Sequence, residues 1–98
     1  MSRSRRVIRV YPDYSATWPL WESTAENNTP TPADLGLSSE LEADIRRWFD
    51  FWEVHFHWER GWDSDESQLQ SAAAGKQFVA QLRKEVASFA DVDDTLFG

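Results

Sequence analysis

The sequence lacks cysteine altogether, and this absence excludes two classes of site. Without thiols the chain can neither form disulfides nor bind a metal ion through thiolates. It also holds only two histidines, so nitrogen ligands are scarce. A chain without cysteine gives no sign of an oxidising compartment. We therefore expect a cytoplasmic protein with no metal ion and no cofactor.

Long hydrophobic runs are missing as well. No apolar stretch approaches the roughly 18 residues that are needed to cross a bilayer, so we expect no membrane insertion. The first residues, MSRSRR, are basic as in a signal peptide, but VIRVYPDY follows where the apolar run would be. Glycine-rich phosphate loops, the HExxH pattern, the serine nucleophile elbow and the EF-hand loop are also absent. The sequence thus contains no recognisable catalytic or metal-binding motif.

Negative charge dominates the chain, which has 17 acidic and 10 basic residues and a net charge of −7. The first ten residues contain four arginines and no acid, so the remaining 88 residues carry a net −11. Such a body repels phosphate backbones and attracts basic proteins. We expect no nucleic-acid partner, whereas a basic protein partner fits this charge. The alternative is that the acidic surface only aids solubility.

The length and composition predict one folded domain over residues 1–98. Hydrophobic residues make up 41% of the chain and aromatic residues 14%, which is enough apolar area for one core. Residues 1–5 are expected to form a flexible arm. Residues 23–36 are polar and punctuated by proline, so we expect a mobile loop there.

The hydrophobic pattern predicts an α+β fold. Residues 5–11 alternate so that Ile8 and Val10 share one face, which is typical of a half-buried strand. A capping box at Ser39 predicts a helix that ends near Arg60, with Gly61 as its stop. The predicted core stripe of this helix comprises Leu41, Ile45, Trp48, Phe49, Trp52 and Phe56.

A second capping box, at Asp63, predicts another helix over residues 64–88. The short link between the two helices predicts an antiparallel hairpin. The tail ADVDDTLFG is expected to supply a short strand beside the first one, through Val92 and Leu96. Residues 18–21, Trp-Pro-Leu-Trp, are too apolar to stay in water, so we expect a long loop anchored on the helices.

Potential proton-transfer groups cluster near the end of the first predicted helix. His55 and Glu59 are four residues apart at the edge of the apolar stripe, where a general acid/base pair is possible. Glu53 and His57 lie on the opposite, solvated side. Two ligands are too few for a metal site. The alternative is that His55 and Glu59 only hydrogen-bond each other or the nearby chain and complete the core.

Aromatic residues suggest a binding surface, because such residues are enriched at the centres of protein interfaces. The candidates are Trp18, Trp21, Phe51, Trp58 and Trp62. The alternative is that these rings fill the core. On the first helix, Phe51, Val54 and Trp58 lie outside the arc that a partner helix can cover. We therefore expect either the loop at residues 18–21 or a second copy, in a two-fold dimer, to cover them.

The order of these segments resembles a family of small uncharacterised proteins from high-GC Gram-positive bacteria. The resemblance rests on the N-terminal strand, the Trp-Pro-Leu-Trp segment, and Asp34-Leu35-Gly36-Leu37-Ser38 before a Trp-rich helix, and it covers roughly residues 7–90. It implies a bacterial, cytoplasmic protein. No activity is established for that family, so the resemblance assigns no functional residue.

Two functions stay open from the sequence. The first is a non-enzymatic protein-binding module, similar to the acidic immunity or antitoxin proteins that block a basic toxin by charge and shape complementarity. The second is a small enzyme or ligand-binding protein that uses His55 and Glu59 beneath the Trp-Pro-Leu-Trp segment. The acidic body and the absence of catalytic motifs favour the first.

Overall fold

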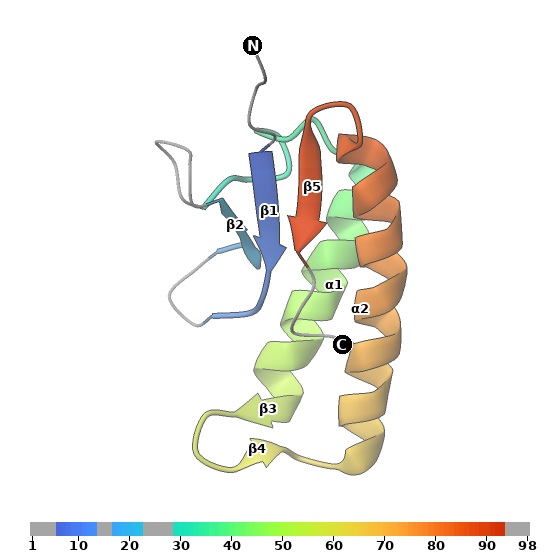
Figure 1. Ribbon diagram of the computed structural model, residues 1–98. Coiled ribbons are helices and arrows are strands. Elements are labelled where there is room, and N and C mark those ends of the chain that lie inside the picture. Colours follow the sequence, from blue (N-terminus) through green and yellow to red (C-terminus); the bar gives the residue numbers. More distant parts are fainter. Residues whose placement is uncertain (1–5, 14–16, 23–28, 94–98) are drawn as a thin grey trace.

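A computed structural model describes residues 6–13, 17–22 and 29–93. The arm predicted at residues 1–5, the first six residues of the loop predicted at 23–36, and Leu96 of the predicted C-terminal strand lie outside this range. The fold is α+β, as predicted (Figure 1). Its elements are β1 (Arg6–Val10), β2 (Leu20–Glu22), α1 (Ser39–His55), β3 (Phe56–His57), β4 (Gly61–Trp62), α2 (Asp65–Val86) and β5 (Ala90–Asp93).

The main sheet has three strands in the order β2-β1-β5. Strand β1 pairs antiparallel with β2 and parallel with β5, in which Val92 lies opposite Ile8. Parallel strands need a long crossover connection, and the two helices supply it. Ile8 and Val10 are buried while Arg9 is exposed, so the predicted alternation and the predicted C-terminal strand are both confirmed.

The Trp-Pro-Leu-Trp segment is only partly a loop, which corrects the sequence expectation. Leu20 and Trp21 belong to the edge strand β2, where Leu20 pairs with Val10 and is fully buried. The Trp21 ring stacks on Tyr11 with centroids 4.7 Å apart, and its Nε1 donates to the Tyr11 carbonyl. The sequence did not reveal this strand because the proline before Leu20 argues against a ladder, although an edge position tolerates it.

Helices α1 and α2 form the predicted antiparallel hairpin and pack against the sheet (Figure 1). Five residues of the predicted stripe on α1, together with Phe78, Val79, Leu82 and Val86 of α2 and Ile8, Val10 and Leu20 of the sheet, form one buried cluster. Gly75 is also buried on α2. No helix in the described parts of the chain is long and apolar enough to span a membrane.

In each helix the capping residue lies one position away from the predicted one: Ser38 in place of Ser39, and Ser64 in place of Asp63. Ser38, not Ser39, caps α1: its hydroxyl accepts from the backbone N–H of Leu41. The Glu85 carboxylate, on the last turns of α2, accepts from both the backbone N–H and the hydroxyl of Ser38, at 2.7 Å each. These bonds hold the pKa of Glu85 below its usual value. They also join the start of one helix to the end of the other.

Replacing Ser38 with alanine should lower the free energy of unfolding by about 1 kcal/mol, because the first N–H groups of α1 lose their side-chain acceptor. Ser39→Ala is the matched control, since Ser39 is exposed and is the cap that the sequence pattern favours. It should change stability by less than about 0.5 kcal/mol. Urea unfolding of both variants measures the difference. Equal effects, or a larger effect at Ser39, would contradict the assignment of Ser38 as the cap.

Candidate functional site

Helix α1 ends at His55, five residues earlier than predicted. Phe56 adopts extended backbone angles, and its N–H donates to the Trp52 carbonyl. Phe56 and His57 then form β3, which pairs with Gly61 and Trp62 of β4 in a short antiparallel hairpin. Gly61 has a φ of 75°, in the left-handed region that favours glycine. The prediction that Gly61 ends the first helix is therefore wrong, because Gly61 belongs to the β-hairpin.

Ring packing explains why the chain leaves the helix here. Phe56 stacks on Trp52 with centroids 5.4 Å apart, and Trp62 meets Phe56 edge-on at 5.5 Å. The two strands therefore extend the core beyond the last turn of α1. A continued helix would place Phe56 and Trp62 on different faces of the chain. Aromatic residues also favour strands.

His55 and Glu59 do not form the helical pair that the sequence suggested, because Glu59 lies in the turn between β3 and β4. His55 instead places its Nδ1 2.7 Å from the Asp63 carboxylate and 3.4 Å from the Ser67 hydroxyl. The backbone N–H of Asp63 donates to the His55 carbonyl at 2.8 Å. These contacts join the end of α1 to the start of α2. They match the alternative in which His55 bonds the nearby chain.

The other predicted pair, Glu53 and His57, is also absent, because His57 lies in β3 and its Nδ1 accepts from the backbone N–H of Glu59. On the same helix, Arg46 and Asp50, four residues apart, form an ion pair at 3.6 Å. Among the described residues, no group of three or more histidine, cysteine, aspartate or glutamate side chains could hold a metal ion.

Asp63 gives the helix junction a defined dependence on pH. Hydrogen bonds to the Ser67 side chain, and then to His55, lower the pKa of Asp63 below its usual value of 3.8. A carboxyl with a lowered folded pKa stabilises the fold above its unfolded pKa, and this contribution is lost as the pH falls through the folded pKa. Asp63→Asn should therefore lose less stability than the wild type when the pH is lowered from 7 to below 3.8.

Urea unfolding at several pH values measures this difference directly. Asp65→Asn, which removes the exposed carboxylate two residues later, is the charge-matched control. An Asp63→Asn curve that runs parallel to the wild-type curve would show that Asp63 does not contribute.

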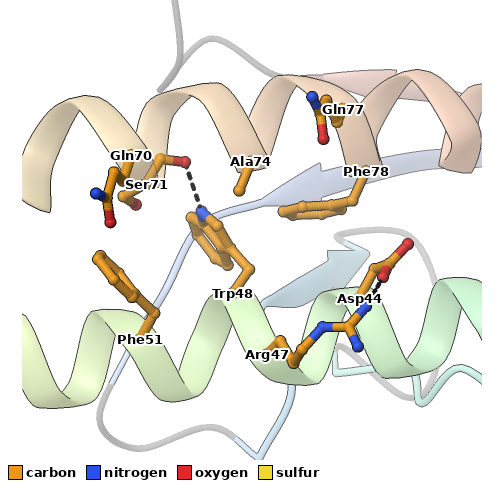
Figure 2. Close-up of a pocket in the computed structure, with 9 residues that line it drawn as sticks. All are labelled: Asp44, Arg47, Trp48, Phe51, Gln70, Ser71, Ala74, Gln77 and Phe78. Carbon is orange, nitrogen blue, oxygen red and sulfur yellow. Dashed lines mark hydrogen bonds and ion pairs between the residues drawn. The ribbon is translucent and has the colours of Figure 1, made fainter.

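A pocket of about 340 Å³ lies between α1 and α2, on the side of the helix pair that faces away from the sheet (Figure 2). Trp48 and Phe78 form its floor, with ring centroids 5.1 Å apart, and the Trp48 Nε1 donates to the Ser71 carbonyl. Its remaining lining residues are Asp44, Arg47, Phe51, Gln70, Ala74 and Gln77. The pocket thus has an apolar floor and a polar rim, as small binding sites commonly do.

The five aromatic candidates are distributed over separate parts of the structure. Trp18 lies over the Arg46 guanidinium at 4.2 Å, and Arg46 also donates to the Thr17 carbonyl. Trp21 is on β2, and Trp62 packs on the core at the far end of α1. The structure therefore does not gather these candidates at one place, and their role in binding stays a prediction.

The remaining two candidates leave apolar surface accessible. Phe51 is half-buried and lines the pocket, with its ring 4.2 Å from that of His55. Trp58, in the β3–β4 turn, is 69% exposed, and Val54, on the last turn of α1, is 75% exposed. In the described chain the Trp-Pro-Leu-Trp segment packs elsewhere and does not cover them. The expected two-fold dimer, the other candidate cover, stays a prediction.

Sequence reasoning missed the pocket and the partner of His55. The pocket needs the small residues Ser71 and Ala74 of α2 opposite Trp48 and Phe51, and only the register between the helices brings them together. The small residues Ser71 and Ala74 on one face of α2 were the sequence feature that could have indicated the pocket, because they leave room beside the Trp48 and Phe51 rings. Asp63 was interpreted only as a helix cap, whereas the hairpin brings it back to His55.

A protein-family model described as Serratia CdiI immunity protein-like matches residues 6–93. The match runs from the first residue of β1 to the last residue of β5, so it covers every element of the fold. No curated protein matches the chain. The matched range is close to the residues 7–90 over which the sequence showed its resemblance.

Proposed function

Because the chain belongs to the Serratia CdiI immunity protein-like family, we propose that it binds a protein toxin and blocks the toxin's activity. The family match over residues 6–93 is the observation that carries this proposal. The net charge of −7 supports a basic toxin, since opposite charge speeds encounter and disfavours wrong partners. We infer a cytoplasmic site of action. The origin in a high-GC Gram-positive bacterium stays a prediction.

The structure gives less support to an enzyme based on His55 and Glu59. The histidine nitrogen Nδ1 faces Asp63 and Ser67, and Glu59 lies in a turn. The Trp-Pro-Leu-Trp segment packs on β1 and on Arg46, so it does not cover His55. A protein-binding role needs no such arrangement, because it depends on surface shape and charge.

The test uses the protein domain encoded beside the gene of this chain in its host. Titration calorimetry of that purified domain with the chain should show a one-to-one complex that weakens as salt rises. Co-expression should restore growth to cells that the domain inhibits. A domain that neither binds nor is neutralised, together with a pull-down from host extract that recovers no specific partner at low or physiological salt, would contradict the proposal.

A further inference from the structure

The β3–β4 hairpin lies at one end of the molecule (Figure 1), and apolar side chains are exposed there. Val54 and Trp58 are 75% and 69% exposed, and Phe51 is half-buried. Phe51 and Val54 are three residues apart on α1, so they share one side of the helix, and Phe51 leads into the interhelical pocket. We call Phe51, Val54 and Trp58 the tip surface. Exposed large apolar side chains at one end of a molecule are a feature of protein-binding sites.

The hairpin holds Trp58 in a defined position. Phe56 pairs with Trp62 and His57 with Gly61, so the turn that contains Trp58 is closed by two residue pairs. Phe56 in turn stacks on Trp52 of the core, and the Trp58 ring lies against His57 with centroids 5.8 Å apart. Because the hairpin holds the backbone of this turn, less backbone ordering is needed when Trp58 binds a partner.

The charge around the tip surface indicates what covers it. Residues 53–66 contain five carboxylates and a single arginine, a net charge of −4, and all five carboxylate side chains are exposed. These acids are Glu53, Glu59, Asp63, Asp65 and Glu66. A two-fold dimer centred on Trp58 would bring two such acidic ends together, which like-charge repulsion opposes. A basic protein meets no such opposition and is attracted.

We propose that the tip surface is the site at which the basic toxin docks, an inference that rests on the proposed function. Trp58 is the anchor, which enters an apolar depression on the toxin, and the surrounding carboxylates pair with lysine and arginine residues at its rim. Tryptophan is the residue type most often found as a hot spot at interface centres, and rim charges mainly set the association rate.

The test measures binding of the purified toxin domain encoded beside the gene to variants of the full chain. Trp58→Ala should weaken binding by about 30-fold or more, as expected for a hot spot, and should reduce protection of growing cells. Leu69→Ala is the matched control, because Leu69 is equally exposed, at 71%, but lies on α2 and belongs neither to the tip surface nor to the pocket lining. It should change the affinity by less than about twofold.

The double variant Glu59→Gln, Asp65→Asn should mainly slow association and flatten its salt dependence. Unchanged melting curves show that each variant is folded. If wild type binds and Trp58→Ala binds equally well, the docking surface is wrong and the proposed function stands. If wild type neither binds nor protects, both fail. If the free chain sediments at twice its 11.4 kDa mass and Trp58→Ala restores the monomer, the tip surface is a dimer interface, which overturns the proposal.

Discussion

Replacing Trp52 with alanine should lower the free energy of unfolding by about 3 to 5 kcal/mol. Trp52 is 6% exposed on α1 and packs against two rings, Phe49 at 5.7 Å and Phe56 at 5.4 Å. The variant loses the transfer free energy of the indole and also leaves a cavity where the helix meets the β3–β4 hairpin. Because a domain of this size has only about 5 to 15 kcal/mol of stability in total, the variant should be close to unfolding.

Urea and thermal unfolding followed by circular dichroism measure this loss. Trp58→Ala is the matched control, since it makes the same chemical change on a side chain that is 69% exposed. It should change stability by less than about 0.5 kcal/mol. A melting temperature of Trp52→Ala within a few degrees of the wild type would show that Trp52 is not a core residue.

The second large effect is expected at the buried carboxylate of Glu22. This side chain is 2% exposed on β2 and accepts two hydrogen bonds from Arg6, from Nε and Nη2, at 2.6 Å each. Arg6→Ala should cost about 2 to 3 kcal/mol, because it removes the counter-charge of a buried acid. This loss is smaller than the roughly 3 to 5 kcal/mol for breaking a fully buried ion pair, since the Arg6 side chain is 40% exposed and water can approach.

Two further variants make this prediction specific. Arg9→Ala is the control, because Arg9 is on the same strand but its ion pair with Asp93, at 4.0 Å, is exposed. It should cost less than about 1 kcal/mol. The double change Arg6→Met, Glu22→Leu should recover most of the loss, because an apolar pair needs no desolvated charge. A double variant as unstable as Arg6→Ala would show that the loss has another cause.

The two outcomes at the tip of the molecule separate stability from function. Trp58 is expected to contribute almost nothing to folding and much to toxin binding, whereas Trp52, six residues earlier, is expected to do the reverse. Such a split is possible because α1 ends between the two residues, so that Trp52 faces the core and Trp58 faces water. Measuring both properties on both variants tests the fold and the proposed docking surface together.

Part of the candidate site could be predicted from the sequence. The apolar flank at Phe51 and Val54 follows from counting residues around a helix, and Val54 is indeed exposed. Trp58 is also exposed, but it lies in the β3–β4 turn, so helical counting does not explain its position. The acidic character follows from composition. The proposed pairing of His55 with Glu59 is wrong, because it assumed helical spacing beyond His55. Trp18 and Trp21 belong to another part of the fold, where β1 and Arg46 hold them.

The sequence by itself determined the α+β class, strand β1, the helix hairpin and the core faces of both helices, because hydrophobic periodicity and capping residues act over a few neighbouring positions. Only the tertiary structure decided the end of α1, strand β2, the interhelical pocket and the partner of His55. Each depends on residues distant along the chain: Phe56 leaves the helix to pack with Trp62, Leu20 pairs with Val10, and Asp63 returns to His55. Local patterns carry no information about such contacts, because packing and pairing energies arise only once the elements meet.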